Sequence, residues 1–493
     1  MKRFLLCLFV FTIPLLAEEG WLRFSAAGVA RSASPTGRSL KARSASPTGR
    51  SLKARSPSPI GRSLKESSAL PPRQINTGTD KGVIGVKLAV PEFQAAAGDT
   101  KAAALMEIFN KVLWDDLDYS GGVTLVSRSL YPLGKFTSPG EINADEWTTP
   151  AVDAQFIAFG NSQIAADRIR VEARLWDLKA PQNREAIGKA YSSEATDAGA
   201  RLIAHEFADE IIKLIGGGIR GIALTKIAYI GERTIGVKEL YVMDYDGNDS
   251  QAMTAYKSIV MTPAWSPDGE KIAFTSFRRG SPDIEILSRL DRRPYPFDRA
   301  GGTTITPAWS PDGSKIAFAT SRDGSNTEIY VADWNGKNLR RLTVTKAVNV
   351  SPTWNPRTGH EIAFTSDRNG SPQIYIMDDD GTNLRRLVEE GGHAVEPTWS
   401  PDGQRIAFAW LKSRTSNFDI YIHELASSMN TQITHDSGDN ERPRWAPDGR
   451  HIAFESSRSG TTQIYSMLLD GTKVRQLTNS GKNTGPAWSG YIQ

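Results

Sequence analysis

The stretch Pro263-Ala264-Trp265-Ser266-Pro267-Asp268-Gly269 recurs along the C-terminal half of the chain. Its tryptophan returns, each time with a proline two residues before it, at Trp309, Trp354, Trp399, Trp445 and Trp488. Successive tryptophans are 44, 45, 45, 46 and 43 residues apart. A repeat of this length is typical of a β-propeller with four strands per blade. The sequence therefore predicts six blades.

The residues between the tryptophans predict the strands of each blade. The P-x-W segment is the short inner strand. The P-D-G after it makes a tight turn, because proline fixes φ and glycine accepts positive φ. An I-A-F strand follows, as at Ile272, and then an I-Y strand, as at Ile329. A second turn, such as D-D-D-G from Asp378, leads to an outer strand that ends in R-R-L.

The first and last repeats are offset from each other. The I-A-Y strand at Ile227 has no tryptophan strand before it, and the tryptophan strand at Pro486 has no blade after it. We predict that the C-terminal strand completes the first blade, since this hides two strand edges that would otherwise invite aggregation. Large aromatic residues dominate core burial, so the repeated tryptophans are predicted to be wedges between blades.

We predict an α/β domain at residues 74–221, ahead of the propeller. The propeller is assigned to residues 222–493. The apolar patterns of the α/β domain indicate strands at 83–90, 123–126, 154–159 and 169–176, and helices at 101–117 and 197–215. The glycines at 216–218 end the second helix.

Residues 1–17 read as a secretory signal. Lys2 and Arg3 precede an apolar run, and Ala17 offers a small residue for cleavage, with a second option after Ala30. The single cysteine, Cys7, lies inside that run, so the mature chain has no thiol chemistry. We expect the protein to be exported from the cytoplasm.

Residues 18–73 are expected to be a disordered tract. Within them, residues 31–66 repeat a twelve-residue unit three times, with nine Lys or Arg and one acid. Such a composition cannot bury enough apolar surface to offset chain entropy. The tract is interpreted either as a solvated spacer or as a basic arm attracted to anionic lipid or nucleic acid. No aromatics are interleaved for base stacking, and no nucleic-acid partner is expected.

No motif in the sequence assembles a catalytic or cofactor site. The G-x-G-x-x-G pattern from Gly216 follows a helix and precedes a strand, the reverse of a dinucleotide loop. His205-Glu206 lacks the second histidine of a zinc helix. The D-x-D-G turns lack the remaining ligands of a calcium loop. We expect a protein that is not an enzyme, with no cofactor and no metal.

What remains is a surface at one mouth of the propeller channel. The residues just ahead of each P-x-W segment are expected there: Thr262, Thr306, Ser351, Glu396, Arg442 and Gly485. Five arginines of neighbouring loops share that face: Arg278, Arg322, Arg368, Arg414 and Arg458. These arginines either pair with local carboxylates or form a charged docking rim.

Several segments resemble the TolB family of the bacterial Tol–Pal envelope system. They are R-L-I-A-H-E from Arg201, I-R-G from Ile219, T-K-I-A-Y from Thr225 and the tail P-A-W-S from Pro486. The resemblance covers residues 74–493. It implies a monomeric periplasmic adaptor that docks a Pal-like outer-membrane lipoprotein at the propeller mouth and contacts the outer membrane through its partners. The residues implied there are Thr262, Thr303, Thr306, Ser351, His393, Glu396 and Arg442.

The resemblance also implies that an N-terminal arm binds a TolA-like inner-membrane protein. Gln74, Ile75, Asn76 and Thr77 lie at the start of that arm. The implied role is support of envelope integrity and of outer-membrane constriction at cell division. Two alternatives stay open: a periplasmic propeller that binds a glycan or a peptide, and the accessory propeller of a peptidase.

Overall fold

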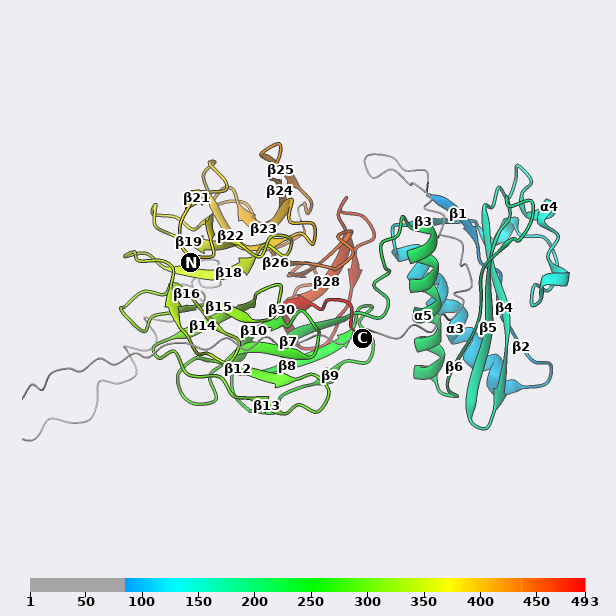
Figure 1. The fold of residues 1–493 in the computed structure, drawn as a ribbon, viewed down its shortest axis with the longest axis horizontal. Helices are drawn as coiled ribbons and strands as arrows, with labels where there is room; N and C mark the ends of the chain where they lie inside the picture. The colour runs from blue at the N-terminus through cyan, green and yellow to red at the C-terminus, as the bar shows by residue number, and fades with distance from the viewer. Residues whose placement is uncertain (1–84, 436, 493) are drawn as a thin grey trace, which may run out of the picture. The chain divides into compact units, whose positions relative to one another are not determined.

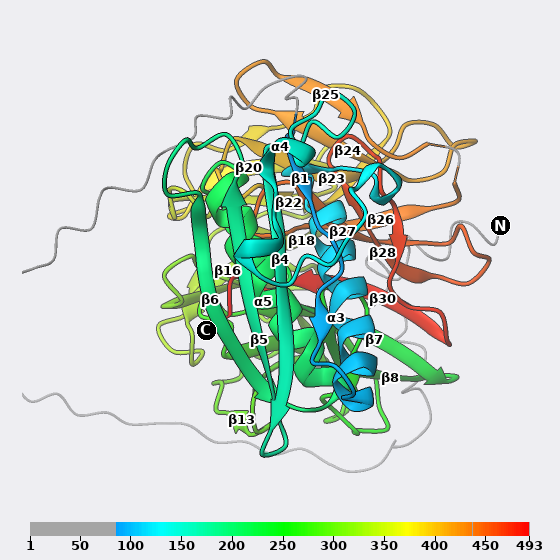
Figure 2. The same cartoon turned by 90° about the vertical axis from the view of Figure 1, so that its right-hand side faces the viewer.

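The computed structural model describes residues 85–435 and 437–492, and the predicted signal, basic tract and arm lie outside them. The described chain begins with a six-stranded sheet in the order β3-β1-β4-β5-β6, to which β2 adds beside β4. Strand β1 is parallel to β3 and β4, whereas β4, β5 and β6 are antiparallel. Figure 2 shows β4, β5 and β6 as three long adjacent arrows. The bounds are β1 (Val86–Ala89), β2 (Gln94–Ala95), β3 (Val123–Leu125), β4 (Phe156–Ala165), β5 (Arg168–Asp177) and β6 (Glu185–Glu194).

Two long helices, α3 (Thr100–Tyr119) and α5 (Asp197–Ile215), cover one face of this sheet (Figure 1). Each begins at a side-chain cap: Asp99 accepts from the backbone N–H of Ala102, and Thr196 accepts from that of Gly199. The segment after β3, with η1 (Arg128–Leu130), η2 (Pro139–Glu141) and α4 (Ala144–Trp147), packs Trp147 into a second core. None of the helices in the described residues has the length and apolar character needed to cross a membrane.

The sequence predicted both long helices and four of the six strands of this domain, and the two-residue strand β2 and the short helices η1, η2 and α4 were not predicted. The predicted helix at 197–215 has the bounds of α5. Strand β6, however, was missed. Only Ile187 and Tyr191 are buried along it, and small or polar residues fill the other positions, so its apolar pattern is weak.

The remainder is a propeller of six four-stranded antiparallel sheets, which confirms the predicted fold class. The first sheet has the order β30-β7-β8-β9, so the last strand of the chain is its inner strand. Its strands are β30 (Lys482–Trp488), β7 (Lys226–Thr234), β8 (Val237–Asp244) and β9 (Gln251–Ala252). Trp488 stands opposite Ile227, which confirms the predicted circular closure.

The other five sheets repeat this arrangement in chain order, from the inner to the outer strand. They are β10 (Val260–Trp265), β11 (Lys271–Ser276), β12 (Asp283–Ser288) and β13 (Pro294–Tyr295); β14 (Thr304–Trp309), β15 (Lys315–Thr320), β16 (Glu328–Asp333) and β17 (Arg340–Arg341); β18 (Asn349–Trp354), β19 (Glu361–Ser366), β20 (Gln373–Asp378) and β21 (Arg385–Arg386); β22 (His393–Trp399), β23 (Arg405–Leu411), β24 (Asp419–Glu424) and β25 (Met429–Gln432); and β26 (Asn440–Trp445), β27 (His451–Ser456), β28 (Gln463–Leu468) and β29 (Arg475–Gln476).

The repeated tryptophans lie buried where adjacent blades meet, as predicted. The indole N–H of Trp265 donates to the carbonyl of Ala487 at 3.0 Å, and that of Trp309 donates to Ala264 at 3.2 Å. The next three tryptophans repeat this bond to the preceding blade. Each of these five tryptophans therefore fills the space between blades and satisfies its polar atom there, whereas Trp488 donates to the hydroxyl of Thr225.

Candidate interaction site at the propeller channel

The six inner strands share a backbone irregularity at the residue before each P-x-W segment. Pairing with the second strand of the blade shifts register at this residue in every sheet, which marks a β-bulge. The residue itself has φ between 52° and 59°, in the left-handed region. We call these six residues the bulge ring: Thr262, Thr306, Ser351, Glu396, Arg442 and Gly485. Five of them are not glycine, so the ring holds a conformation that costs free energy in most side chains.

Hydrogen bonds between blades hold the bulge ring in place. The backbone N–H of Thr306 donates to the hydroxyl of Thr275 in the preceding blade, and that of Ser351 donates to the hydroxyl of Thr306, both at 3.1 Å. Glu396 makes the same kind of bond to a threonine, and Gly485 donates to a carboxylate oxygen of Glu455 at 2.6 Å. The ring is therefore fixed by its neighbours before any partner arrives.

All six residues of the bulge ring line the central channel, a cavity of about 330 Å³ walled by the inner strands of every blade. The sequence prediction for Thr262, Thr306, Ser351, Glu396 and Arg442 at the channel thus agrees with where the structure places them. Which of them contacts a partner stays a prediction.

Two predicted mouth residues, Thr303 and His393, do not line the channel. Each lies three residues before the bulge ring, half-buried at the start of an inner strand. The backbone N–H of Thr303 donates to the hydroxyl of Ser321 at 3.0 Å. Burial and the charge of Arg414 lower the pKa of His393. The four arm residues, Gln74 to Thr77, lie outside the described residues.

The charge of the bulge ring is concentrated on two neighbouring blades. Arg442 donates from Nε to Glu396 at 2.9 Å and from Nη1 to Glu455 at 3.0 Å. Both carboxylates are almost fully buried, with side chains 10% and 5% exposed. Burial alone would lower the pKa of Arg442, but the two carboxylates outweigh it and raise that pKa. One side of the channel is therefore ionic, whereas the side of Thr262, Thr306 and Ser351 offers hydroxyls.

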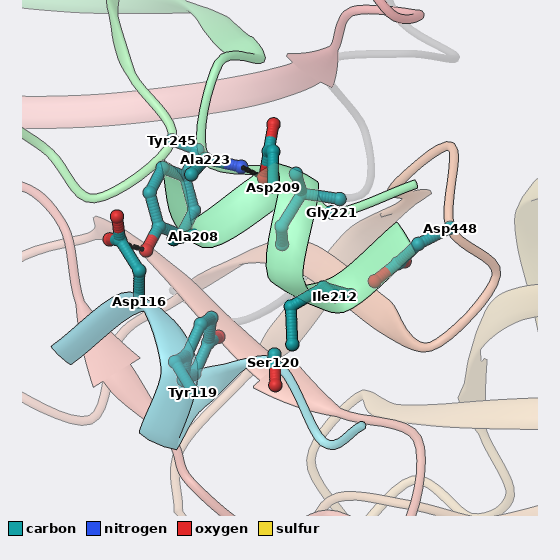
Figure 3. A pocket seen from close by; sticks show the side chains of 11 residues that line it. Asp116, Tyr119, Ser120, Ala208, Asp209, Ile212, Gly221, Ala223, Tyr245 and Asp448 are labelled. Atoms are coloured by element: carbon teal, nitrogen blue, oxygen red, sulfur yellow. Dashed lines mark hydrogen bonds between the residues drawn. The ribbon is translucent and has the colours of Figure 1, made fainter. Parts of the chain in front are cut away.

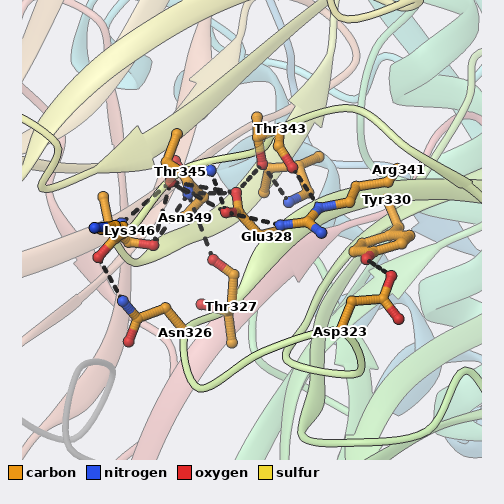
Figure 4. Close-up of polar contacts among 12 residues, drawn as sticks. Asp323, Asn326, Thr327, Glu328, Tyr330, Arg341, Thr343, Thr345, Lys346 and Asn349 are labelled. Carbon is orange, nitrogen blue, oxygen red and sulfur yellow. Dashed lines mark hydrogen bonds and ion pairs between the residues drawn. The ribbon is translucent and has the colours of Figure 1, made fainter.

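The loops that lead to the ring are fixed by buried polar clusters. In Figure 4, Glu328 accepts from the side-chain amide of Asn349 at 2.8 Å, from Arg341 at 3.2 Å and from Thr343. Asn349 opens the inner strand that carries Ser351, and it is fully buried. The start of that strand is thereby tied to the third strand of the preceding blade.

Four of the five loop arginines have partners within their own blades, of two kinds, and Arg414 is exposed. Arg278 pairs with Glu285 at 2.6 Å and Arg322 with Asp323 at 3.2 Å, which is local pairing. Arg368 instead donates to Ser366 and Asn349 and lies over the ring of Tyr375, 4.6 Å from its centroid. Arg458 repeats this arrangement on its own blade. The guanidinium groups of Arg368 and Arg458 are thus held by polar side chains and an aromatic ring of their own blades.

His205 takes part in a second buried polar cluster, away from the channel. Its Nδ1 lies 2.7 Å from Asp116 of α3, and Asp116 also accepts from the hydroxyl of Tyr245, after β8. Although burial opposes it, the charge of Asp116 raises the pKa of His205. Figure 3 shows Asp116, Tyr245 and Asp209 around a cavity of about 10 Å³, close to the smallest that holds a water molecule. Within residues 85–435 and 437–492, no three His, Cys, Asp or Glu side chains gather as metal ligands.

Sequence reasoning missed Glu455, which pairs with Arg442, and the channel residue Arg444. Glu455 lies on the second strand of its blade, where the I-A-F pattern drew attention only to apolar positions. Arg444 lies between the proline and the tryptophan of a P-x-W segment, a position that the pattern leaves free. Aligning the six segments by their tryptophans would have singled it out, since the other five residues there are alanine or threonine.

Comparison with known proteins places both parts of the chain in one family. A profile of the TolB beta propeller domain matches residues 215–409 and 387–491, and a profile of the TolB amino-terminal domain matches residues 78–184. The Tol-Pal system protein TolB of Desulfosudis oleivorans is 34% identical over 219 residues, which are 44% of this chain and 48% of that protein. That of Dinoroseobacter shibae is 34% identical over 278 residues, 54% of this chain and 60% of that protein. The chain thus matches about half the length of such relatives.

A solved structure extends the likeness over most of the fold. The crystal structure of TolB from Acinetobacter baumannii superposes with a TM-score of 0.70 at 25% identity, covering 83% of this chain and 97% of the other. The two domain profiles and this superposition span the α/β sheet and the propeller alike. The chain belongs to the TolB family.

Proposed function

We propose that this chain is a non-enzymatic periplasmic adaptor of a Tol–Pal system. It binds a Pal-like outer-membrane lipoprotein at the channel mouth and a TolA-like inner-membrane protein through an arm that starts at Gln74. In this role it supports envelope integrity and outer-membrane constriction during division. Family membership supports the proposal, because the relatives are named Tol-Pal system proteins.

The bulge ring is the observation that carries the mouth assignment. A surface whose backbone is fixed in advance loses little conformational entropy when a partner binds. Its division into an ionic side, with Glu396 and Arg442, and a hydroxyl side gives the mouth an orientation that a partner can match in charge. His393, whose lowered pKa leaves its imidazole neutral at pH 7, adds a hydrogen-bonding group beside the ionic side.

The arm is assigned to the inner-membrane partner by its place in the chain. Residues 74–84 lead directly into β1, which lies inside the first sheet. We propose that these residues add as a strand to the sheet of the inner-membrane partner, a mode of binding in which backbone hydrogen bonds supply affinity. The Arg- and Ser-rich repeat ahead of the arm then acts as a spacer.

The first test is capture from detergent-solubilised envelopes by the mature protein, with and without residues 18–73. We expect both forms to recover a Pal-like lipoprotein. Recovery of no envelope protein by either form would overturn the adaptor proposal and favour a ligand-binding propeller.

The second test assigns the face. Glu396→Gln keeps size and removes charge, so it should weaken binding of the purified lipoprotein about tenfold or more by calorimetry. His393→Ala should weaken the same binding. Glu270→Gln is the matched control, since Glu270 follows the inner strand at its other end and is 64% exposed. Equal affinity for all three variants would refute the mouth assignment.

A further inference from the structure

In the part of the chain that the structure describes, one charged side chain of the central channel has no carboxylate within ion-pair distance. Its wall includes the residue between proline and tryptophan of every P-x-W segment. Five of these residues are short: Ala264, Ala308, Thr353, Thr398 and Ala487. The sixth is Arg444, on β26. A long cationic side chain therefore stands in a channel whose equivalent positions are small and neutral.

The contacts of Arg444 leave most of its donors free. Its Nη1 donates to the carbonyl of Pro443, its own neighbour, at 2.8 Å. Among the residues that the structure describes, no carboxylate lies within ion-pair distance of its guanidinium, whereas Arg442 on the same strand is held by two. A guanidinium carries five N–H donors in a planar fork, so several of them face the channel.

This arrangement is costly without a ligand. Burial lowers the pKa of Arg444, yet an arginine in a protein stays charged. The charges of Glu396 and Glu455 oppose this shift from beyond ion-pair distance, and a partly desolvated cation without a direct ion pair is stabilised further by an anion that reaches it. The channel has the space, because about 330 Å³ is within the range of small-molecule pockets.

We propose that the channel binds a small monoanionic carboxylate ligand and that the guanidinium of Arg444 binds its carboxylate. The two oxygens of a carboxylate match the guanidinium fork, which a spherical ion cannot do. Glu396 faces the same channel, so a doubly charged phosphate is repelled more than a carboxylate. The hydroxyls of Thr353 and Thr398 can bond polar groups next to the carboxylate, while proline and tryptophan side chains contact its apolar part.

The test uses N-acetylglycine and its neutral amide, N-acetylglycinamide, as a matched pair of probes. Ligand-detected NMR titration of the full mature protein should give a dissociation constant for the acid at least tenfold lower than for the amide. Arg444→Ala should weaken binding of the acid at least tenfold and leave binding of the amide unchanged. Arg444→Lys, which keeps the charge and loses the fork, should fall between the two.

Two controls keep the result interpretable. Arg444→Ala places alanine where three other blades already have it, so its melting temperature should match that of the wild type within a few degrees. Arg405→Ala removes an arginine that lies over the ring of Trp445 but does not line the channel, and it should bind the acid normally. The proposal is overturned if Arg444→Ala binds the acid as well as the wild type does, if acid and amide bind equally, or if the acid does not bind.

Competition then identifies the source of the carboxylate. If N-acetylglycine weakens capture of the Pal-like lipoprotein, the carboxylate belongs to that docked partner, a result that also rests on the proposed function. If it binds without affecting capture, the ligand is a free solute. Both outcomes are consistent with a carboxylate site at Arg444. If the acid does not bind there, the adaptor proposal is unaffected, because capture of the lipoprotein tests it separately.

Discussion

Replacing Arg442 by methionine should destabilise the propeller strongly, because it leaves two buried carboxylates without their cationic partner. Methionine keeps the length and much of the packing of the side chain but cannot pair with Glu396 or Glu455. Removing one partner of a buried ion pair costs about 3–5 kcal/mol, and since Arg442 is itself 25% exposed we expect about 2–4 kcal/mol. Glu455 also accepts from the backbone of Gly485, so the loss reaches the closing strand.

Differential scanning calorimetry checks this prediction. A loss of that size should lower the melting temperature by about 5–10 °C. The control is Arg293→Met, whose side chain is 84% exposed and pairs only with a near neighbour on the surface, so it should shift the melting temperature by little. If both variants melt alike, water rather than Arg442 stabilises these carboxylates, and our account of the ionic side of the channel is wrong.

Three further outcomes are expected. Burial raises the pKa of Asp209 to about 6, above the ordinary 3.8, so the free energy of unfolding of the wild type should decrease as pH rises from about 4 to about 6. This decrease is worth at most about 3 kcal/mol, and melting curves of Asp209→Asn should not show it. Asn349→Ala should cost about 1–3 kcal/mol in urea unfolding because it removes a buried donor from Glu328, whereas Asn369→Ala, at an exposed turn position, should cost little. Deleting residues 482–493 removes the inner strand of the first blade, and limited proteolysis should then cut the propeller rapidly.

Prediction from sequence succeeded where the same residue type occupies the same position in every repeat and contacts only its own blade or the next one. The P-D-G turns, the I-A-F strands and the tryptophan wedges each act within a blade or against the next one, so a period of about 45 residues was enough to count them. It failed at β6, where only Ile187 and Tyr191 are buried, and it could not choose a partner for Arg368, which stacks on the ring of Tyr375.

The candidate site was predictable in position but not in its chemistry. Counting back from each tryptophan placed Glu396 and Arg442 at the channel, and the structure has them there. Neither their pairing nor the left-handed backbone beneath them has a sequence signal, since threonine, serine, glutamate and arginine all occupy the same position. Those features depend on how adjacent inner strands are held together.

By itself, the sequence determined the six blades, the circular closure and the small sheet domain that precedes them. These follow from periodic apolar residues and turn residues, whose effects are local along the chain. The tertiary structure alone decided that Arg442 lies between Glu396, 46 residues away, and Glu455, 13 residues away. It also decided that no carboxylate of the described part of the chain lies within ion-pair distance of Arg444 in the same channel. The physical reason is that electrostatic energy depends on distance in space and on burial, and closure of the ring sets both.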